Sequence, residues 1–464
     1  MNFWTRKTFE FNQSKKKLIV VLLNIPVGNR CEEIYYALLK ARREGKRTLF
    51  FRVYHFLPWK FGFRYTNHSV LHITSPFNAN EKWVLRFFGN LLLSAILVPG
   101  SVCKRIPLAI KSRISNYFVL KPVNLLLSFF IKVNPVMTEP IASGWESLWV
   151  SQNNIKRFSW ENVKRMEWKK QIGTPLPIKM NPRKWKVAHK MRLKMGIPES
   201  DWFMCLHVRE GGFHSDWESS KHRNADISNY IKAIEYVTAN GGWVVRLGDS
   251  SMKKLPNIER VIDYPFTHFK CALMDVYLIS ECRFYSGTAS GIFDMAILFQ
   301  KPMVLANIYS WIDSSPPRQG DLGILKHFYS KSKGRYLSVQ EILEVPPEKQ
   351  GYSEFNRDED LEMHENSPEE IYDLFVEFLE NFELRNEESL SGLQKQYTRR
   401  FYEQGKKALL ECKTVTVQDT DEGTMFQKYR FAAKVCGFQG TLGRRYLAEN
   451  SEISSRNSPK MHVV

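Results

Sequence analysis

Short apolar runs alternate with helical patterns along the second half of the chain. Residues 202–208 and 243–249 are rich in Val, Leu, Met and Cys, which is typical of strands buried on both faces. Between them, residues 227–242 place apolar side chains at helical spacing and end at two glycines. The alternation continues through residues 259–265, 268–281, 282–288, 290–300 and 301–307. Strands that alternate with helices in this way predict a parallel, doubly wound sheet.

A similar pattern opens the chain. Residues 18–24 and 48–54 form apolar runs typical of strands, and the stretch between them carries Ile34, Leu38 and Ala41 at helical spacing. A strand–helix–strand unit is therefore predicted. A basic start before an apolar run also suggests a signal peptide, but the run is short and no small-residue cleavage pattern follows it.

The chain of 464 residues is long enough for two or three domains. We expect two Rossmann-like α/β domains, the first over residues 1–140 and the second over residues 196–345. Residues 141–195, rich in Trp and Lys, are predicted to form a helical connector. Residues 346–464 are predicted to hold an acidic segment, helices and a partly disordered tail.

The net charge of +19 is concentrated near the N-terminus, where residues 1–121 interleave 21 Lys and Arg with Phe, Trp, Leu and Ile. This pattern favours an anionic membrane surface over a nucleic-acid groove, although a solvated basic face would carry the same charge. Seven scattered cysteines without a C-x-x-C pair favour a reducing compartment. No apolar run reaches the about 20 residues that a bilayer requires. We therefore expect a cytoplasmic protein, peripheral on the inner membrane.

Polar residues and glycines cluster where three of the predicted strands end. Because ligands of open parallel sheets bind beyond the carboxyl ends of the strands, we expect these clusters to share one cleft. They are His207, Arg209 and Glu210 after the first strand, Arg246, Gly248 and Asp249 at the second, and Ser286, Gly287, Thr288, Ser290 and Gly291 at a later one.

The segment 286–291, with the sequence SGTASG, opens a predicted helix. The unpaired backbone N–H groups and the positive dipole end of a helix start suit a phosphate group. The alternative is a plain N-cap, because Ser and Thr are favoured there in any helix. The serine spacing does not match a nucleophile elbow.

Arg209 is the main candidate for a ligand contact. A guanidinium at a strand end can bind a diphosphate bidentately and stabilise charge on a leaving group. The alternative is a salt bridge to Glu210, Asp226 or Asp249. His207 could support Arg209 or contact the ligand, or could be a buried core histidine. Glu210, ahead of Asp249, is the candidate general base.

The polar segment before residue 227 holds Arg223, which adds positive charge, and Asp226, which is suited to cap the following helix. Glycine-rich nucleotide motifs and the zinc-protease pattern are absent from the sequence. D-x-D triplets occur only at 358–360 and 419–421, outside both predicted cores. We therefore expect chemistry without a metal ion or a bound cofactor.

Several segments resemble a family of bacterial glycosyltransferases encoded among surface-polysaccharide genes. They are LHVREGGF, RNADISNYIKAIEYVTANGGWVVRLGD, SGTASGIFDMAILFQKPMVLAN, GDLGILKHF and GTLGRRYLAEN. The His-x-Arg at a strand end is similar, more distantly, to fucosyltransferases whose arginine holds the GDP diphosphate. The resemblance covers about residues 145–450 and is strongest over 200–310. The sequence Glu210-Gly211-Gly212 departs from the second Arg and the acid of fucosyltransferases, which argues against GDP-fucose as the donor.

The resemblance implies two Rossmann-like domains facing a cleft, the GT-B arrangement, with the nucleotide-sugar donor in the C-terminal domain and the acceptor in the N-terminal domain. By position, Arg209 would hold the diphosphate. The other donor-side residues would be His207, Arg223, Arg246, Gly248, Ser286, Gly287, Thr288, Ser290 and Gly291. On the acceptor side we expect Gly28 and Asn29.

The resemblance, taken with the strand-end clusters, implies a metal-independent glycosyltransferase that moves a sugar from a nucleotide-sugar donor to a cell-surface polysaccharide or lipopolysaccharide acceptor. A nucleotide-sugar 2-epimerase is one alternative, since it can share the fold, but it needs no acceptor site. A non-catalytic scaffold that binds glycans or nucleotides is another. Nucleic-acid binding would explain the charge but not the strand-end clusters.

Overall fold

The computed structural model describes residues 178–214, 218–345, 358–414 and 439–451, together with short segments and single residues of the first 177. The chain divides into two compact units. Unit 1 comprises Met1–Trp168 and Pro175–Asn181, and unit 2 comprises Lys169–Thr174 and Pro182–Val464.

Unit 1 contains the predicted strand–helix–strand arrangement. Strand β1 (Lys17–Leu22) pairs in parallel with β2 (Arg47–Arg52), and the buried Ile34 and Leu38 lie in helical backbone between them. This part of the prediction is confirmed.

Two further strand pairs in unit 1 are antiparallel. They are β3 (Ile73–Thr74) with β6 (Lys179–Met180), and β4 (Leu148–Val150) with β5 (Ile155–Arg157). Three of these strands fall within residues 141–195, for which we expected helices alone. In that stretch the described helix is α7 (Pro182–Lys194). The Trp and Lys content of the stretch therefore did not distinguish strand from helix.

Unit 2 is built on a seven-stranded sheet in which every neighbouring pair is parallel, so the predicted doubly wound sheet is confirmed. The strand order is β16-β12-β11-β10-β7-β8-β9. The strands are β7 (Phe203–His207), β8 (Trp243–Arg246), β9 (Val261–Asp263), β10 (Tyr285–Gly287), β11 (Met303–Ile308), β12 (Leu322–Leu325) and β16 (Thr441–Leu442).

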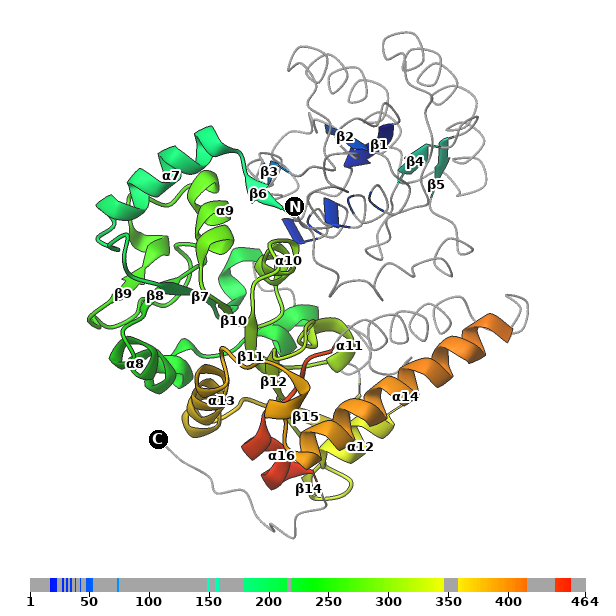
Figure 1. Cartoon of the computed structure of the whole chain (residues 1–464). Coiled ribbons are helices and arrows are strands. Elements are labelled where there is room, and N and C mark those ends of the chain that lie inside the picture. The colour runs from blue at the N-terminus through cyan, green and yellow to red at the C-terminus, as the bar shows by residue number, and fades with distance from the viewer. Residues whose placement is uncertain are drawn as a thin grey trace. The chain divides into compact units, whose positions relative to one another are not determined.

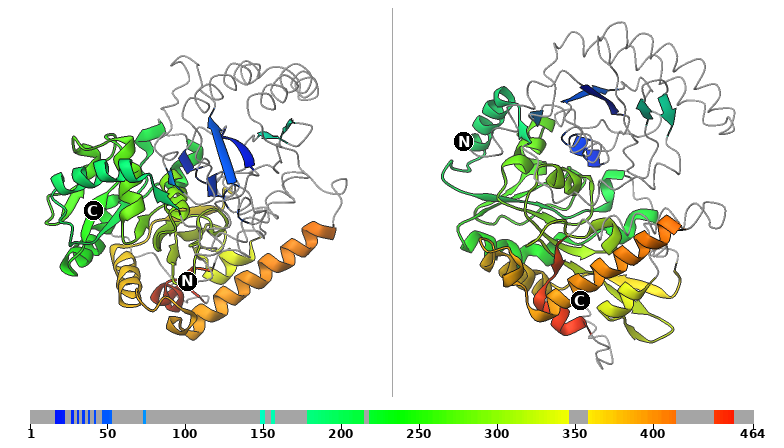
Figure 2. Two further views of the ribbon diagram at one scale, coloured as in Figure 1. Left: turned by 45° about the horizontal axis from the view of Figure 1, so that its top comes forward. Right: turned by 45° about the vertical axis from the view of Figure 1, so that its right-hand side comes forward.

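Helices cover both faces of this sheet (Figures 1 and 2). Helix α8 (Ile231–Ala239) packs with α13 (Pro368–Glu380) on one face, and α9 (Ala272–Glu281) packs with α10 (Gly291–Leu298) on the other. Helix α7 lies against α9. Apolar side chains of α13 meet the sheet at Phe284, whose ring centroid lies 5.1 Å from that of Phe378.

Helix α13 lies in residues 346–464, for which we predicted an acidic segment and helices. Its N-cap is Ser367, whose hydroxyl accepts the N–H of Glu370, while the Glu370 carboxylate accepts the N–H of Ser367. This capping box leaves Leu374 and Phe378, one turn apart, buried on the inner side. The acidic residues of the helix are therefore compatible with a well-defined apolar face.

Unit 2 continues beyond residue 345, where we expected the second domain to end. Strand β16 adds to the edge of the main sheet, and a small antiparallel sheet has the order β14-β13-β15. Its strands are β13 (His327–Ser330), β14 (Arg335–Tyr336) and β15 (Leu361–His364). The remaining elements are η5 (Gly211–His214), η6 (Glu218–Arg223), η7 (Ile227–Tyr230), η8 (Tyr264–Phe266), α11 (Trp311–Ser314), α12 (Val339–Glu344), η11 (Glu387–Ser389), α14 (Gly392–Thr414) and α16 (Arg444–Asn450).

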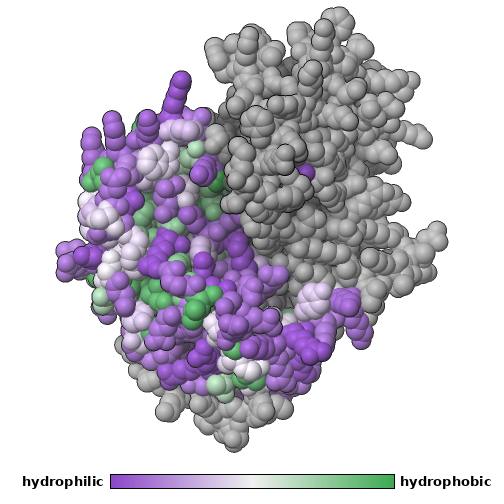
Figure 3. All heavy atoms as spheres, in the orientation of Figure 1, coloured by the Kyte–Doolittle hydropathy of each residue, from purple (hydrophilic) through white to green (hydrophobic). Residues whose placement is uncertain are grey.

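The surface of unit 2 seen in Figure 3 is mostly hydrophilic, with hydrophobic side chains gathered in small areas. Among the described helices, none combines the length and apolar character needed to cross a bilayer. The predicted disorder of the last residues concerns positions 452–464, which lie outside the described residues.

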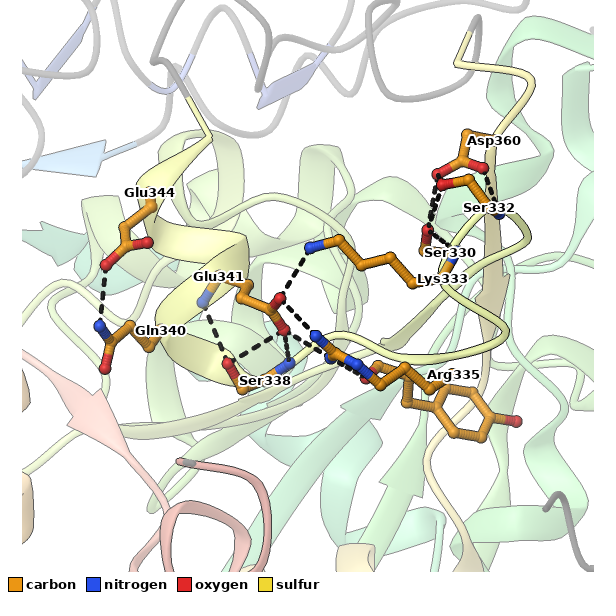
Figure 4. Close-up of polar contacts among 10 residues, drawn as sticks. Ser330, Ser332, Lys333, Arg335, Ser338, Gln340, Glu341, Glu344 and Asp360 are labelled. Atoms are coloured by element: carbon orange, nitrogen blue, oxygen red, sulfur yellow. Dashed lines mark hydrogen bonds and ion pairs between the residues drawn. The ribbon is translucent and has the colours of Figure 1, made fainter. Parts of the chain in front are cut away.

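Polar contacts fix the small sheet and helix α12 (Figure 4). The Glu341 carboxylate accepts two hydrogen bonds of 2.8 Å from Arg335 and one of 2.7 Å from Lys333, and these contacts hold the pKa of Glu341 well below its usual range. Asp360, in one of the D-x-D triplets, accepts hydrogen bonds from the Ser330 hydroxyl and the Ser332 N–H, both at 2.7 Å. These acidic groups therefore have structural roles.

Candidate active site

The order of the strands reverses between β7 and β10. From β7 the chain continues to β8 and β9 on one side, and it then returns to β10 and continues to β11 on the other. In open parallel sheets, such a switch point leaves a crevice beyond the carboxyl ends of the strands, where ligands bind. His207 and Gly287 end these two strands and are register partners. Two of the predicted strand-end clusters therefore meet at the switch point.

A glycine and a hydroxyl group hold the two strand ends together. Gly287 has φ +151°, and a Cβ atom there would lie 2.1 Å from the carbonyl oxygen of His207, so only glycine fits. The N–H of Thr288 donates to that carbonyl at 3.1 Å. The Thr288 hydroxyl accepts the N–H of Arg209 at 2.9 Å. The backbone that carries Arg209 is thus fixed by the residue that follows β10.

His207 is buried at the end of β7, and its Nδ1 lies 3.1 Å from the hydroxyl oxygen of Ser290. Burial, followed by the charge of the Arg246 guanidinium, lowers the pKa of His207 to about 3. The imidazole is therefore neutral at physiological pH. It contributes a hydrogen bond to the start of α10 but no positive charge that could neutralise an anionic ligand. This placement favours the alternative of a buried core histidine.

Two arginines reach the same edge from different segments. Arg209 is 7% exposed, and its guanidinium donates to the side-chain oxygen of Asn224. Arg223 donates from Nε and Nη2 to the carbonyl oxygen of Ala289, at 3.1 and 2.8 Å. Because Ala289 lies two residues before α10, Arg223 is close to the helix start that we expected to hold a phosphate. The charge of Arg209 lowers the pKa of His207, whose ring contacts Ser290 at the same helix start.

Lys326 is a third cation at this edge, which the polar clusters at the predicted strand ends did not include. It follows β12, is 4% exposed, and donates from Nζ to the carbonyl oxygen of Asn224 at 2.7 Å. Burial lowers the pKa of Lys326, while the Glu365 carboxylate acts in the opposite direction. The available signal was a lysine inside the apolar run GILKHF, where a charged residue requires a partner.

Residues 221–226, called the 221–226 segment below, are held from several elements. Asn224 contacts Arg209 through its side chain and Lys326 through its carbonyl group. The N–H of Asp226 donates to Glu365, which follows β15, at 2.8 Å. Asp226 also accepts the N–H of Ser228 at 2.8 Å and caps η7, so its predicted capping role is confirmed. The segment therefore links the carboxyl ends of β7 and β12.

Arg246 lies in a buried ion pair. It is fully buried and donates to Glu210 Oε1 at 2.8 Å and to Asp263 Oδ1 at 3.0 Å. Glu210 Oε2 accepts the backbone N–H of Lys253 at 2.7 Å. This placement argues against the donor contact that we expected of Arg246. It also argues against Glu210 as the general base, because both of its oxygens already accept hydrogen bonds.

Asp249 follows β8 and is only partly buried, and its Oδ1 accepts the N–H of Ser251 at 2.9 Å. The negative charge of Asp249 acts to raise the pKa of His207, whereas the charges of Arg246 and Arg209 lower it. The Asp249 carboxylate therefore lies near the switch point. Asp249 therefore replaces Glu210 as the first candidate for a general base. Gly248 has φ +146°, and a Cβ atom there would lie 2.1 Å from the Met252 sulfur, so this glycine serves the turn.

The serines of the SGTASG segment have different roles. Ser286 is fully buried in β10, and among the described residues its hydroxyl has no hydrogen-bond partner, which argues against the expected donor contact. Ser290 is the N-cap of α10, which begins at Gly291. Its hydroxyl oxygen lies 3.1 Å from His207 Nδ1 and forms no capping hydrogen bond with the helix. The first turn carries Asp294. The attraction of this site for an anion therefore rests mainly on the two arginines.

The expected acceptor-side residues belong to unit 1. Gly28 lies in helical backbone, and Asn29 lies outside the described residues. Most of the basic region 1–121 also lies outside them. Within the part of the chain that the structure describes, no group of three or more His, Cys, Asp or Glu is arranged to hold a metal ion. Chemistry without a metal remains a prediction.

Comparison with known proteins found no matching family model and no matching curated protein. Among solved structures, the ADP-heptose lipopolysaccharide heptosyltransferase II of E. coli is 12% identical and has a TM-score of 0.34, over 79% of this chain and 99% of that one. A glycosyl transferase family 9 protein of Veillonella parvula is 10% identical with a TM-score of 0.33, over 63% and 81%. The heptosyltransferase TibC, in complex with ADP-D-beta-D-heptose, is 16% identical with a TM-score of 0.18, and the match spans 24% of this chain and 29% of that one. Similarity at this level defines neither a fold nor an activity for the chain.

Proposed function

We propose that this chain is a glycosyltransferase of the GT-B type that moves a sugar from a nucleotide-sugar donor to a cell-surface polysaccharide or lipopolysaccharide acceptor. The observation that carries the proposal is that two arginines meet where the strand order reverses: Arg209 follows β7 and is fixed by Thr288, and Arg223 binds the carbonyl oxygen of Ala289 just before α10. A diphosphate fits this position because it can accept bidentate hydrogen bonds from a guanidinium and is attracted to a helix start. The diphosphate would compete with the side-chain oxygen of Asn224 for hydrogen bonds from the Arg209 guanidinium.

The transfer is a direct displacement. The acceptor hydroxyl oxygen forms a bond to the anomeric carbon, and the bond between that carbon and the donor phosphate oxygen breaks. The electron pair of the broken bond leaves with the nucleoside diphosphate, where Arg209 and Arg223 stabilise the added charge. Asp249 accepts the proton of the acceptor hydroxyl. No metal ion takes part in this scheme.

In the proposed arrangement, unit 2 binds the donor and residues 1–140 bind the acceptor. The basic and aromatic residues of the N-terminal region hold a lipid-linked or anionic acceptor at the inner membrane surface. Arg209 is the residue whose loss separates the proposal from its alternatives. A transferase loses turnover without it, whereas a binding scaffold shows only altered affinity.

The test is a thermal-shift screen against GDP, UDP, CMP, ADP, dTDP and their sugars. A nucleotide at 100 times its dissociation constant should stabilise the folded protein by about 2.7 kcal/mol. Arg209→Ala should lose this response, because the diphosphate loses its bidentate partner. Arg399→Ala is the matched control, since the Arg399 side chain is 81% exposed on α14 and pairs with Glu403.

A product assay with the nucleotide that binds completes the test. Transfer of sugar to a polysaccharide or lipopolysaccharide acceptor supports the proposal. Formation of an epimer of the donor without any acceptor would support the 2-epimerase instead, and binding without turnover would support the scaffold. A wild-type protein that responds to none of these nucleotides refutes a donor site at the switch point.

A further inference from the structure

Helix α7 presents an outer face that combines lysines with exposed aliphatic side chains. Its thirteen residues, PRKWKVAHKMRLK, include no Asp or Glu. Lys186, Lys190 and Lys194 are exposed, as are Val187 at 52% and Leu193 at 42%. At 3.6 residues per turn these five side chains fall within an arc of about 120°. They are called the α7 lysine face below.

The opposite side of α7 is anchored to the body of unit 2. His189 Nδ1 lies 2.9 Å from the hydroxyl oxygen of Tyr277 on α9, and Trp185 stacks on the His189 ring at 4.5 Å. Arg192 is 8% exposed and donates to the carbonyl oxygens of Pro198 and Asp201 at 2.7 and 2.6 Å. The orientation of the helix is therefore fixed by its inner contacts, and the lysine face is directed outward.

We propose that the α7 lysine face docks on the anionic surface of a phospholipid bilayer. Three ammonium groups complement lipid phosphates, and no carboxylate of α7 opposes them. Leu193 and Val187 flank the three lysines, one at each border of the arc, where they can enter the boundary between head groups and acyl chains. The face lies on described residues of unit 2 and includes no residue of the basic region 1–121.

The exposed aliphatic side chains favour a bilayer over a nucleic acid. A nucleic-acid backbone offers phosphates to the lysines but gives Val187 and Leu193 no apolar surface to enter. The area of unit 2 where α7 lies in Figure 1 is mainly hydrophilic in Figure 3, with single hydrophobic side chains interspersed. The exposed side of α14 differs from the α7 lysine face because it also carries an acidic residue, Glu403, which pairs with Arg399 at 3.0 Å.

The test is co-sedimentation of the full chain with phosphatidylcholine vesicles, with and without phosphatidylglycerol, at low and high sodium chloride. We expect binding to the anionic vesicles at low salt only. The variant Lys186→Glu/Lys190→Glu/Lys194→Glu should weaken it about 100-fold, since three surface lysines are lost. The control Lys395→Glu/Lys406→Glu/Lys407→Glu makes the same charge change on the exposed side of α14 and should retain binding.

Each other outcome overturns the proposal. Absence of wild-type binding removes the membrane partner, and an α7 variant that binds like the wild type assigns the contact to another part of the chain. Equal loss in the α14 control shows that net charge alone is responsible. If the α7 variant loses binding to duplex RNA but keeps vesicle binding, the partner is a nucleic acid. Because vesicle binding requires no nucleotide, the result is independent of the proposed transferase activity.

Discussion

Asp321 carries a carboxyl group that is buried just before β12. It lies at the amino ends of the strands, whereas the candidate site lies at their carboxyl ends. It is fully buried, and its two oxygens accept the N–H groups of Met303 and Arg318 at 2.8 and 3.0 Å. Burial raises the pKa of Asp321 to about 7, although the charge of Arg318 and both hydrogen bonds act in the opposite direction. The folded state therefore retains a proton that the unfolded chain releases near pH 4.

The sign of the pH dependence follows from this difference. Between about pH 4 and pH 7 the folded state binds more protons than the unfolded state, so the contribution of Asp321 to stability falls as the pH rises. It is complete below the unfolded pKa and is lost above about pH 7. A difference of about 3 pKa units corresponds to about 4 kcal/mol in the free energy of unfolding.

The perturbation is Asp321→Asn, which removes the titration. The new amide places an N–H against one backbone donor, which costs about 1–3 kcal/mol at every pH. Superimposed on this constant difference, the stability of the wild type relative to the variant should fall by about 4 kcal/mol from pH 4 to pH 8. Urea unfolding followed by circular dichroism over this range measures both proteins.

The control is Asp358→Asn, an exposed carboxyl group that also accepts a backbone N–H, from Asp360 at 3.0 Å. This variant makes the same Asp-to-Asn change at an exposed position and gives the baseline against which Asp321→Asn is compared. A constant difference for Asp321→Asn, or one that increases with pH, would refute the reasoning. It would mean that Arg318 and the two N–H donors keep the Asp321 carboxylate ionised despite its burial.

The pKa of about 3 for His207 means that its imidazole should remain neutral, and its NMR Cε1–H signal unshifted, between about pH 5 and pH 8. The contribution of His207 to the free energy of unfolding should be lost only as the pH falls from about 6.5 towards 3. An NMR signal that titrates near neutral pH would contradict the lowered pKa. Lys326→Met should raise the dissociation constant for the nucleotide about tenfold, because Asn224 loses a charged hydrogen-bond donor worth about 1.5–3 kcal/mol. The exposed Lys331→Met is the control in isothermal titration calorimetry, and equal affinities for the two variants would count against a role of Lys326 in the site.

The alternation of strands and helices in unit 2 could be predicted because it depends on local patterns. A run such as residues 202–206 is apolar at every position, and a helix such as α13 repeats its apolar residues every three or four positions. The edge position of β16 could not be predicted. Its two residues carry too little pattern, and they are recognisable as a strand only through their pairing with β12.

The candidate site was predicted only in part. The rule on strand ends brought Arg209 and Thr288 to one edge, because carboxyl ends of parallel strands lie together. It could not show that Glu210 would pair with Arg246 and not with a ligand, because the partner of a charged group is set by tertiary packing. Lys326 was missed for the same reason, since nothing in its immediate sequence indicates the carbonyl oxygen of Asn224.

The hydrogen bonds that assemble the site join distant parts of the chain. The contact between Arg209 and Thr288 spans 79 residues, and that between Lys326 and Asn224 spans 102. During synthesis, β7 and the 221–226 segment therefore leave the ribosome well before their partners exist. Loops of this length close late in folding, because their entropy is lost before the contacts form. A ligand that requires Arg209 in place would bind only chains that have completed the sheet as far as β12, so its binding would report that the strands from β7 to β12 have assembled.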